Sequence, residues 1–172
     1  MFKNNPLKKI PRSPRACYTY TLLFCLGLIG FAIYLQTVMS LAPCPLCEIQ
    51  RLVFLLIAFV SVIALLLKPS YKGICWFSGI IAILALLGAL IAGHQVWLEI
   101  YPPPPSTSCG MSLSYLFKVL PFSSAVKMAI LGTGDCAVVT WRLLGLSIPA
   151  WSFLSFIALS LLSFYTIKVA SK

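Results

Sequence analysis

Four long apolar blocks, separated by polar segments, dominate the pattern of the chain. They cover residues 17–38, 47–67, 74–93 and 149–167. Each block is close to the roughly 20 residues that a helix needs to cross about 30 Å of hydrocarbon, and none shows the polar-apolar alternation of a membrane-barrel strand. Because a backbone inside lipid must satisfy its own hydrogen bonds, this pattern predicts an all-α membrane protein with four transmembrane helices.

The composition agrees with a bundle of helices in lipid. Hydrophobic residues make up 60% of the chain and charged residues only 9%, whereas about a quarter of the residues of a soluble domain are charged. This balance excludes an ordinary soluble domain. We therefore expect residues 1–172 to form one integral membrane domain, a four-helix bundle whose outer surface contacts lipid.

The basic residues are distributed unevenly between the two sides of the predicted membrane domain. Nine of the 13 lie before the first block, between the second and third, or after the fourth: Lys3, Lys8, Lys9, Arg12, Arg15, Lys68, Lys72, Lys168 and Lys172. Loops rich in lysine and arginine stay in the cytoplasm. We therefore expect a multi-pass protein of the bacterial inner membrane with both termini cytoplasmic and two periplasmic loops, residues 39–46 and 94–148. The net charge of +10 then reflects topology and gives no reason to expect a nucleic-acid partner.

The first block has a second interpretation, as a cleaved signal peptide with residues 40–42 as the cleavage site. Its apolar run exceeds the roughly 7 to 15 residues that are usual for such peptides, and Pro43 stands beside the supposed cut. A transmembrane helix is therefore the better interpretation.

The seven cysteines divide into two groups on this topology. Three lie within spans or at their cytoplasmic ends, where we expect small packing side chains that the cytosol keeps reduced: Cys17, Cys25 and Cys75. The other four lie on the oxidising side, two in each loop: Cys44, Cys47, Cys109 and Cys136. These four are the candidate redox residues.

Cys44-Pro45-Leu46-Cys47 is a Cys-x-x-Cys pair, a spacing that lets two thiols close a small and readily exchanged disulfide. Cys47 opens the second block, where the helix N-terminal amides and the helix dipole favour a thiolate. Arg51 follows one turn later on the same face. A cation at the edge of a span is usually paired or functional, so we expect Arg51 to stabilise the Cys47 thiolate and to bind an electron acceptor; an interfacial arginine that reaches toward water is the alternative.

A structural zinc site is another use for four cysteines, because Cys-x-x-Cys is half of a common zinc signature. Cys109 and Cys136 are 27 positions apart and form no second half, and His94 is the single histidine. We therefore predict no metal site, and expect two disulfides or two cysteine pairs that exchange. His94 ends the third block at the predicted depth of Arg51, which makes it a candidate for binding an electron acceptor; an interfacial hydrogen-bonding role is the alternative.

These residues resemble those of the disulfide bond formation protein B family, DsbB, and the resemblance covers essentially the whole chain. It rests on Cys44-Pro45-Leu46-Cys47 with Arg51, residues 94–102, Cys109, Gly134-Asp135-Cys136-Ala137 with Trp141, and residues 145–151. Two features depart from the family pattern. The Pro-Leu pair between the first two cysteines leaves the redox potential of that pair open, and the long proline run of residues 102–105 bears on the choice of partner.

The resemblance implies a thiol oxidase that reoxidises a periplasmic thioredoxin-fold oxidase of the DsbA type. It implies a disulfide between Cys109 and Cys136, which the partner's thiolate attacks at Cys109. Cys136 then exchanges with Cys44, and Cys47 is freed to pass electrons to a quinone. In this scheme the four cysteines are the catalytic residues.

The resemblance also implies where the quinone binds, near Arg51 and His94. Ubiquinone is the expected quinone and menaquinone the alternative. Other functions stay open: a specialised paralogue with a dedicated partner, a relative of vitamin K epoxide reductase, a metal-handling protein, or a non-catalytic scaffold whose loops are stapled by disulfides. The vitamin K family carries its Cys-x-x-Cys near a late span, and a scaffold has no need of an arginine one turn after a cysteine.

The predicted topology can be tested with alkaline phosphatase fusions, because that enzyme is active only in the periplasm. We expect a fusion at Lys72 to be inactive and a fusion at Ser124 to be active. The reverse pattern would contradict the topology and, with it, the assignment of the four redox cysteines to the periplasmic side.

Overall fold

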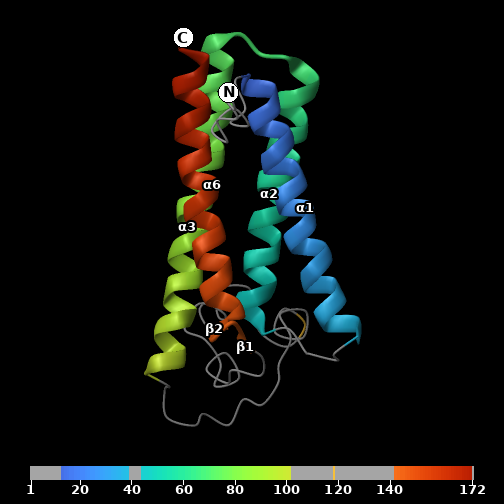
Figure 1. Ribbon diagram of the computed structural model, residues 1–172, viewed down its shortest axis with the longest axis vertical. Coiled ribbons are helices and arrows are strands. Elements are labelled where there is room, and N and C mark those ends of the chain that lie inside the picture. The colour runs from blue at the N-terminus through green and yellow to red at the C-terminus, as the bar shows by residue number, and fades with distance from the viewer. Residues whose placement is uncertain (1–12, 39–43, 102–117, 119–141, 172) are drawn as a thin grey trace, which may run out of the picture.

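The computed structural model describes residues 13–38, 44–101, 118 and 142–171. Within them lie four long helices: α1 (Pro14–Val38), α2 (Pro45–Leu67), α3 (Tyr71–Ile100) and α6 (Ile148–Ala170). Each is long and apolar enough to cross a membrane, so the predicted four-helix membrane class is confirmed (Figure 1). Most of the two predicted loops, including the proline run of residues 102–105, lies outside the described residues.

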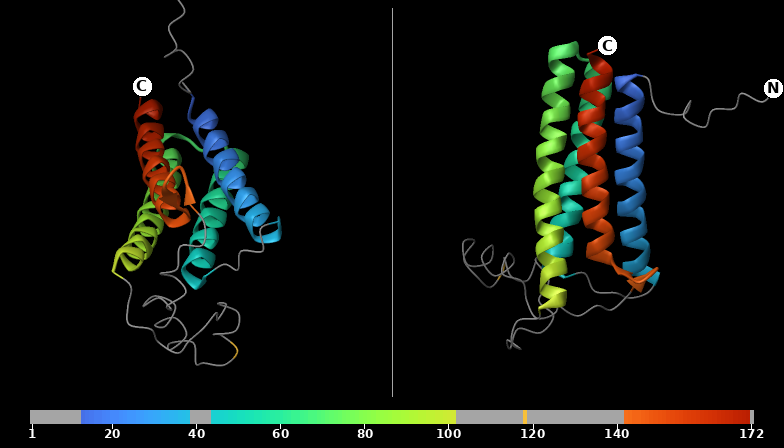
Figure 2. Two further views of the ribbon diagram at one scale, coloured as in Figure 1. Left: turned by 60° about the horizontal axis from the view of Figure 1, so that its bottom comes forward. Right: turned by 60° about the vertical axis from the view of Figure 1, so that its left-hand side comes forward.

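The four helices form an antiparallel bundle in which successive helices lie side by side. α1 contacts α2, α2 contacts α3, α3 packs along α6, and α6 closes the ring on α1. The start of α1 and the end of α6 lie at one end of the bundle, and the start of α2 lies at the other (Figures 1 and 2). We call the second end, where α2 begins after Cys44, the cysteine end.

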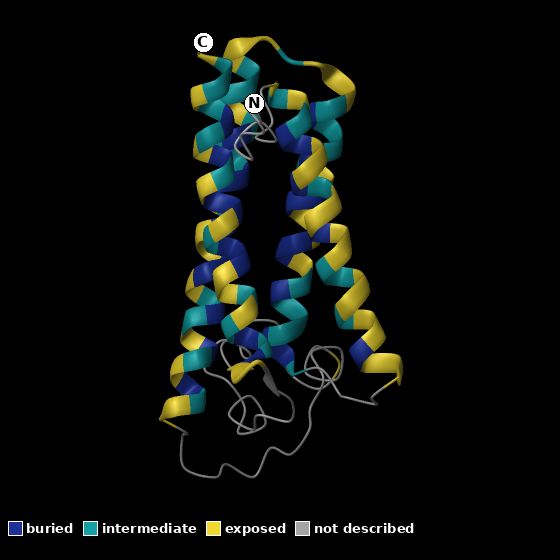
Figure 3. Cartoon of the chain, in the orientation of Figure 1, coloured by how far each residue is buried: buried dark blue, intermediate teal, exposed yellow. Residues whose placement is uncertain are grey.

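Exposed residues lie on the outer surface of the bundle, whereas buried residues face its axis (Figure 3), and many of the exposed residues are large and apolar. Phe59, Leu90 and Leu161, on three different helices, are 63%, 71% and 64% exposed. A surface of this kind suits contact with lipid tails and is unusual for a protein surrounded by water. It agrees with the prediction that the bundle lies in a membrane.

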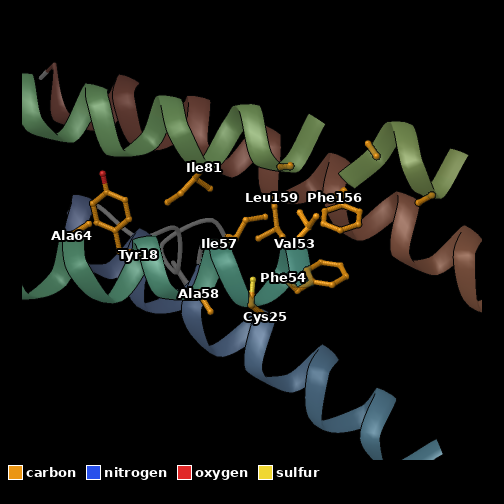
Figure 4. Packing of buried hydrophobic residues seen from close by; sticks show 13 residues of the cluster. Tyr18, Cys25, Val53, Phe54, Ile57, Ala58, Ala64, Ile81, Phe156 and Leu159 are labelled. Atoms are coloured by element: carbon orange, nitrogen blue, oxygen red, sulfur yellow. The ribbon is translucent and has the colours of Figure 1, made fainter. Parts of the chain in front are cut away.

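Aromatic and small residues pack closely between α2, α3 and α6 at the centre of the bundle (Figure 4). The rings of Phe54 and Phe156 stack at a centroid distance of 4.1 Å. Gly88 lies directly against the Phe156 ring, because a Cβ atom on this glycine would come within 2.5 Å of it. Ala85 and Ala92, about one turn before and one turn after Gly88 on α3, are fully buried. Small residues on α3 therefore let α6 come close, as is usual for membrane helices.

Near its start, α1 is joined to α3 by hydrogen bonds. The hydroxyl group of Tyr18 donates a hydrogen bond to the backbone oxygen of Ile74 at 3.2 Å and shares a second with the Ser78 hydroxyl at 2.9 Å. Both partners belong to α3, so these bonds cross the bundle at the end opposite to the cysteine end. In the second half of this helix the buried residue is Leu35.

α3 is longer than the sequence analysis predicted. The predicted span ended at Gly93 and the predicted loop began at His94, but the helix continues to Ile100. The predicted end came from the length of helix that crosses a bilayer. The helix instead ends where the proline at position 102 disfavours helical backbone for Tyr101. The first residues assigned to the long loop therefore belong to the bundle.

A short hairpin precedes α6 at the cysteine end (Figure 1). Its strands, β1 (Arg142–Leu143) and β2 (Leu146–Ser147), pair antiparallel. The turn residues Leu144 and Gly145 have φ values of 53° and 83°, as a type I′ turn requires. Gly145 adopts this backbone without the steric cost of a Cβ atom. The hairpin therefore turns the chain tightly into the start of α6.

The packing of α3 on α6 predicts a large difference between two glycine substitutions on one helix. Gly88→Ala should lower the free energy of unfolding by about 1–3 kcal/mol, because the added methyl group overlaps a fully buried ring. Gly79→Ala is the control, since a Cβ atom there meets nothing within 4 Å; it should leave stability unchanged or raise it by up to about 1 kcal/mol. Unfolding in detergent measures both, and equal stabilities would contradict the described packing.

Candidate functional site

Cys44 and Cys47 lie together at the N-terminal end of α2. Cys44 is the N-cap residue, and its Sγ atom accepts a hydrogen bond of 3.3 Å from the backbone nitrogen of Cys47. Pro45 follows in the first turn, where a residue without an N–H group costs the helix nothing. The Pro-Leu pair therefore serves as a helix start, and it sets both sulfurs at the positive end of the helix dipole, which favours a thiolate.

The two sulfur atoms are close enough to react with each other. The Cys44 thiol donates to the Cys47 Sγ atom at a distance of 2.7 Å, and both side chains are half-buried. A disulfide has a bond length of about 2.05 Å. The pair is thus arranged to alternate between a dithiol and a disulfide.

The side chain of Gln95 enters this site from α3 and contacts both sulfurs. Its Nε2 atom donates to the Sγ atoms of Cys44 and Cys47 at 3.2 Å and 3.3 Å. Its Oε1 atom lies 3.8 Å from the Cys47 Sγ atom and accepts from that thiol. Gln95 is only 3% exposed, so water contributes little here. One amide can therefore donate to a thiolate or accept from a thiol without leaving its place.

Gln50 of α2 completes the polar cluster. Its Nε2 atom donates to the Oε1 atom of Gln95 at 2.8 Å, and its own side chain is 3% exposed. Neither glutamine was predicted from the sequence. A signal was present, because an amide within an apolar span is costly unless it is hydrogen-bonded, and the two residues adjoin Arg51 and His94.

Arg51 has its hydrogen-bond partners on α1. Its Nη1 atom donates to the Oε1 atom of Gln36 at 2.6 Å, and its Nη2 atom donates to the backbone oxygen of Ala32 at 3.1 Å. These bonds connect α1 to α2 at the cysteine end. The predicted action of Arg51 on the Cys47 thiolate and on an electron acceptor is not tested by these contacts and stays a prediction.

His94 and Gln95 point in different directions from α3. Successive residues of a helix are about 100° apart around its axis; His94 is exposed, whereas Gln95 is buried. Gln95, which donates to both sulfurs, is thus the neighbour of His94, the α3 residue that was predicted from the sequence to bind an acceptor. A role for His94 in binding an acceptor stays a prediction.

The remaining cysteines fall into two sets. Cys17 and Cys25 are completely buried in the bundle, and Cys75 is half-buried, which agrees with the packing role predicted for them. Cys25 belongs to the central hydrophobic cluster (Figure 4). Cys109 and Cys136, predicted to form the second redox pair, lie outside the described residues.

Comparison with known proteins identifies the family of this chain. The family model described as "Disulfide bond formation protein DsbB" matches residues 14–166, which include the whole bundle up to the last turn of α6. The chain belongs to the DsbB family. The resemblance that the sequence analysis drew from the cysteine motifs is therefore confirmed.

Relatives match this DsbB family member over most of their length. Disulfide bond formation protein B of Azoarcus sp. (strain BH72) is 35% identical over 156 residues, which are 91% of this chain and 93% of the relative. Disulfide bond formation protein B 1 of Pseudomonas aeruginosa (PAO1) is 39% identical over 85% of this chain and 90% of the relative. Disulfide bond formation protein B of Methylococcus capsulatus (Bath) is 41% identical over 88% and 92%. The protein is thus a disulfide-forming oxidoreductase with membrane-spanning helices.

The Gln95 contacts predict that this amide raises the reactivity of Cys47. The thiolate is the nucleophile, and a lost donor disfavours the thiolate. In a variant that keeps Cys47 as its only cysteine, Gln95→Leu should slow alkylation by iodoacetamide at neutral pH by about tenfold. Val96→Leu, one residue away on the same helix, should leave the rate unchanged. An unchanged rate in Gln95→Leu would show that the amide does not act on the sulfur.

Proposed function

We propose that this DsbB family member is an inner-membrane thiol:quinone oxidoreductase that reoxidises a periplasmic thioredoxin-fold dithiol oxidase of the DsbA type. One observation carries the proposal. The Cys44 and Cys47 Sγ atoms lie 2.7 Å apart at the end of a membrane bundle, and one buried amide, that of Gln95, donates to both. A cysteine pair that only stapled a loop would not need a buried donor suited to the thiolate form.

The arrangement of the bundle supports a periplasmic site. The start of α1 and the end of α6 lie opposite to the cysteine end (Figure 1), and the distribution of basic residues favours cytoplasmic termini. The cysteine end then faces the compartment in which disulfides persist. The half-buried side chain of Cys44 is open enough there for exchange with another thiol.

The electrons pass through two cysteine pairs in this proposal. The cycle starts with both pairs as disulfides, Cys109–Cys136 and Cys44–Cys47. A partner thiolate attacks Cys109, forms a mixed disulfide and releases Cys136, which attacks Cys44 and releases the Cys47 thiolate. The partner's second thiolate displaces Cys109, which then attacks Cys136 and releases Cys44. The partner ends oxidised, the Cys109–Cys136 disulfide is restored, and the Cys44–Cys47 pair is reduced. Two electrons and two protons have thus moved from the partner to the pair; the cysteine placement and the family support this order.

Residues at the cysteine end fit a quinone, with ubiquinone as the proposed form and menaquinone as the alternative. A bound quinone supplies the electron sink, since it takes up two electrons and two protons and becomes a quinol. Its oxygens need hydrogen-bond donors. Within the described structure Arg51 donates one N–H group from each terminal nitrogen to α1, and its guanidinium carries further N–H groups that could donate to an acceptor. Leu52 and Leu55 are exposed beside it and offer an apolar surface, and His94 is a second candidate donor.

The proposed reaction can be followed by the absorbance of the quinone. Purified protein in detergent is mixed with a reduced thioredoxin-fold oxidase and a short-chain ubiquinone. We expect quinol and oxidised partner to form in equal amounts. Cys47→Ser should reduce the rate to background, because the thiolate that donates the electrons is lost.

The matched control replaces Cys17, Cys25 and Cys75 with alanine and should keep a rate close to that of the unaltered protein. A folded protein that reduces neither ubiquinone nor menaquinone would contradict the proposed acceptor. An active Cys47→Ser variant would contradict the proposed order of electron transfer, and oxidation of the partner without quinol formation would point to a different acceptor.

A further inference from the structure

The bond between Gln50 and Gln95 determines which end of the Gln95 amide faces the cysteines. Gln50 uses its Nε2 atom, a donor, to contact the Gln95 Oε1 atom at 2.8 Å. The Oε1 atom is thereby fixed on the Gln50 side, and the Nε2 atom of Gln95 is directed to the two sulfurs. Because both glutamines are 3% exposed, water is a poor substitute for either partner.

The orientation of the Gln95 amide has a chemical consequence for Cys47. A thiolate can only accept hydrogen bonds, so it is stabilised by the Nε2 atom and repelled by the Oε1 atom. The Oε1 atom has a second contact among the described residues, the Cys47 thiol at 3.8 Å. If Gln50 no longer donated to it, this buried oxygen would depend on the protonated thiol as its remaining donor, and the thiol form would gain.

We propose that Gln50 is a positioning residue of the redox site: it holds the Gln95 amide in the orientation that donates to the sulfurs and so favours the Cys47 thiolate. Gln50 acts through Gln95 and need not touch the reacting sulfur. The inference deepens the proposed function, because a larger thiolate fraction speeds any reaction in which Cys47 gives up electrons. It does not depend on which acceptor takes them.

The test is a double-mutant cycle on the reactivity of Cys47. The starting protein is the full chain with Cys47 as its only cysteine; Cys44→Ser keeps a good N-cap side chain at the start of α2. Alkylation by iodoacetamide is measured over a range of pH values. We expect Gln50→Leu to slow the reaction at neutral pH by about threefold to tenfold and to displace the pH profile toward alkaline pH.

The second arm of the cycle repeats Gln50→Leu in the Gln95→Leu protein. If Gln50 acts only through the Gln95 amide, its removal should now change the rate by less than about 1.5-fold. The effects of two substitutions add when the sites act independently, and they do not add when one site acts through the other. Gln50→Glu sharpens the comparison. A carboxylate only accepts, so it should draw the Gln95 Nε2 atom away from the sulfurs and slow alkylation more than Gln50→Leu, whereas any direct effect of its charge should persist without Gln95.

Ser61→Ala is the matched control for loss of a buried polar group on α2, because Ser61 is fully buried and bonds only within its own helix in the described structure. It should leave the pH profile unchanged. Gln50→Met replaces Gln50→Leu if the leucine variant does not fold. Equal effects of the Gln50 substitution in both backgrounds, or no effect in either, would overturn the proposal. Because no quinone or partner takes part, either result is independent of the reaction proposed for the whole protein.

Discussion

The hydrogen bonds from Gln95 to the two sulfurs require α2 and α3 to meet at the cysteine end, and much of the bundle serves that approach. Gln95 lies beyond the point at which a bilayer-length span would have stopped, so the contact depends on the continuation of α3 to Ile100. The position of α3 depends in turn on α6, which packs closely because Gly88 leaves room for the Phe156 ring. A packing constraint in the middle of the membrane therefore helps to set a polar contact at its edge.

The geometry of the cysteine pair has a more local origin. Cys44 caps the helix that Cys47 enters, and Pro45 between them suits the first turn. The separation of the sulfurs follows from four consecutive residues, whereas their electrostatic surroundings depend on α3. The disulfide can therefore form and break within one short segment of α2. The Gln95 amide from α3 can donate to a thiolate or accept from a thiol in either case.

The parts of the structure that could be predicted are those encoded in single segments. Run length predicted the four helices, and the Cys-x-x-Cys spacing at the start of an apolar run predicted that the two sulfurs lie close together. The Gln50–Gln95 contact joins residues 45 positions apart, and it depends on how α2 and α3 are rotated about their axes. Because α3 is apolar on nearly all sides, its sequence shows no preferred face. Adjacent residues such as His94 and Gln95 therefore could not be told apart before their exposure was known.

The contacts of Arg51 show how a cation at the cysteine end is oriented by neutral partners. Its partners on α1 are the neutral side chain of Gln36 and a backbone oxygen. A carboxylate partner would fix the guanidinium equally well, but it would cancel much of the positive potential. Neutral acceptors orient the group and leave its charge in place, one turn of α2 from Cys47. The same bonds connect α1 to α2 at the cysteine end, so Arg51 also helps to hold α1 in its place beside α2.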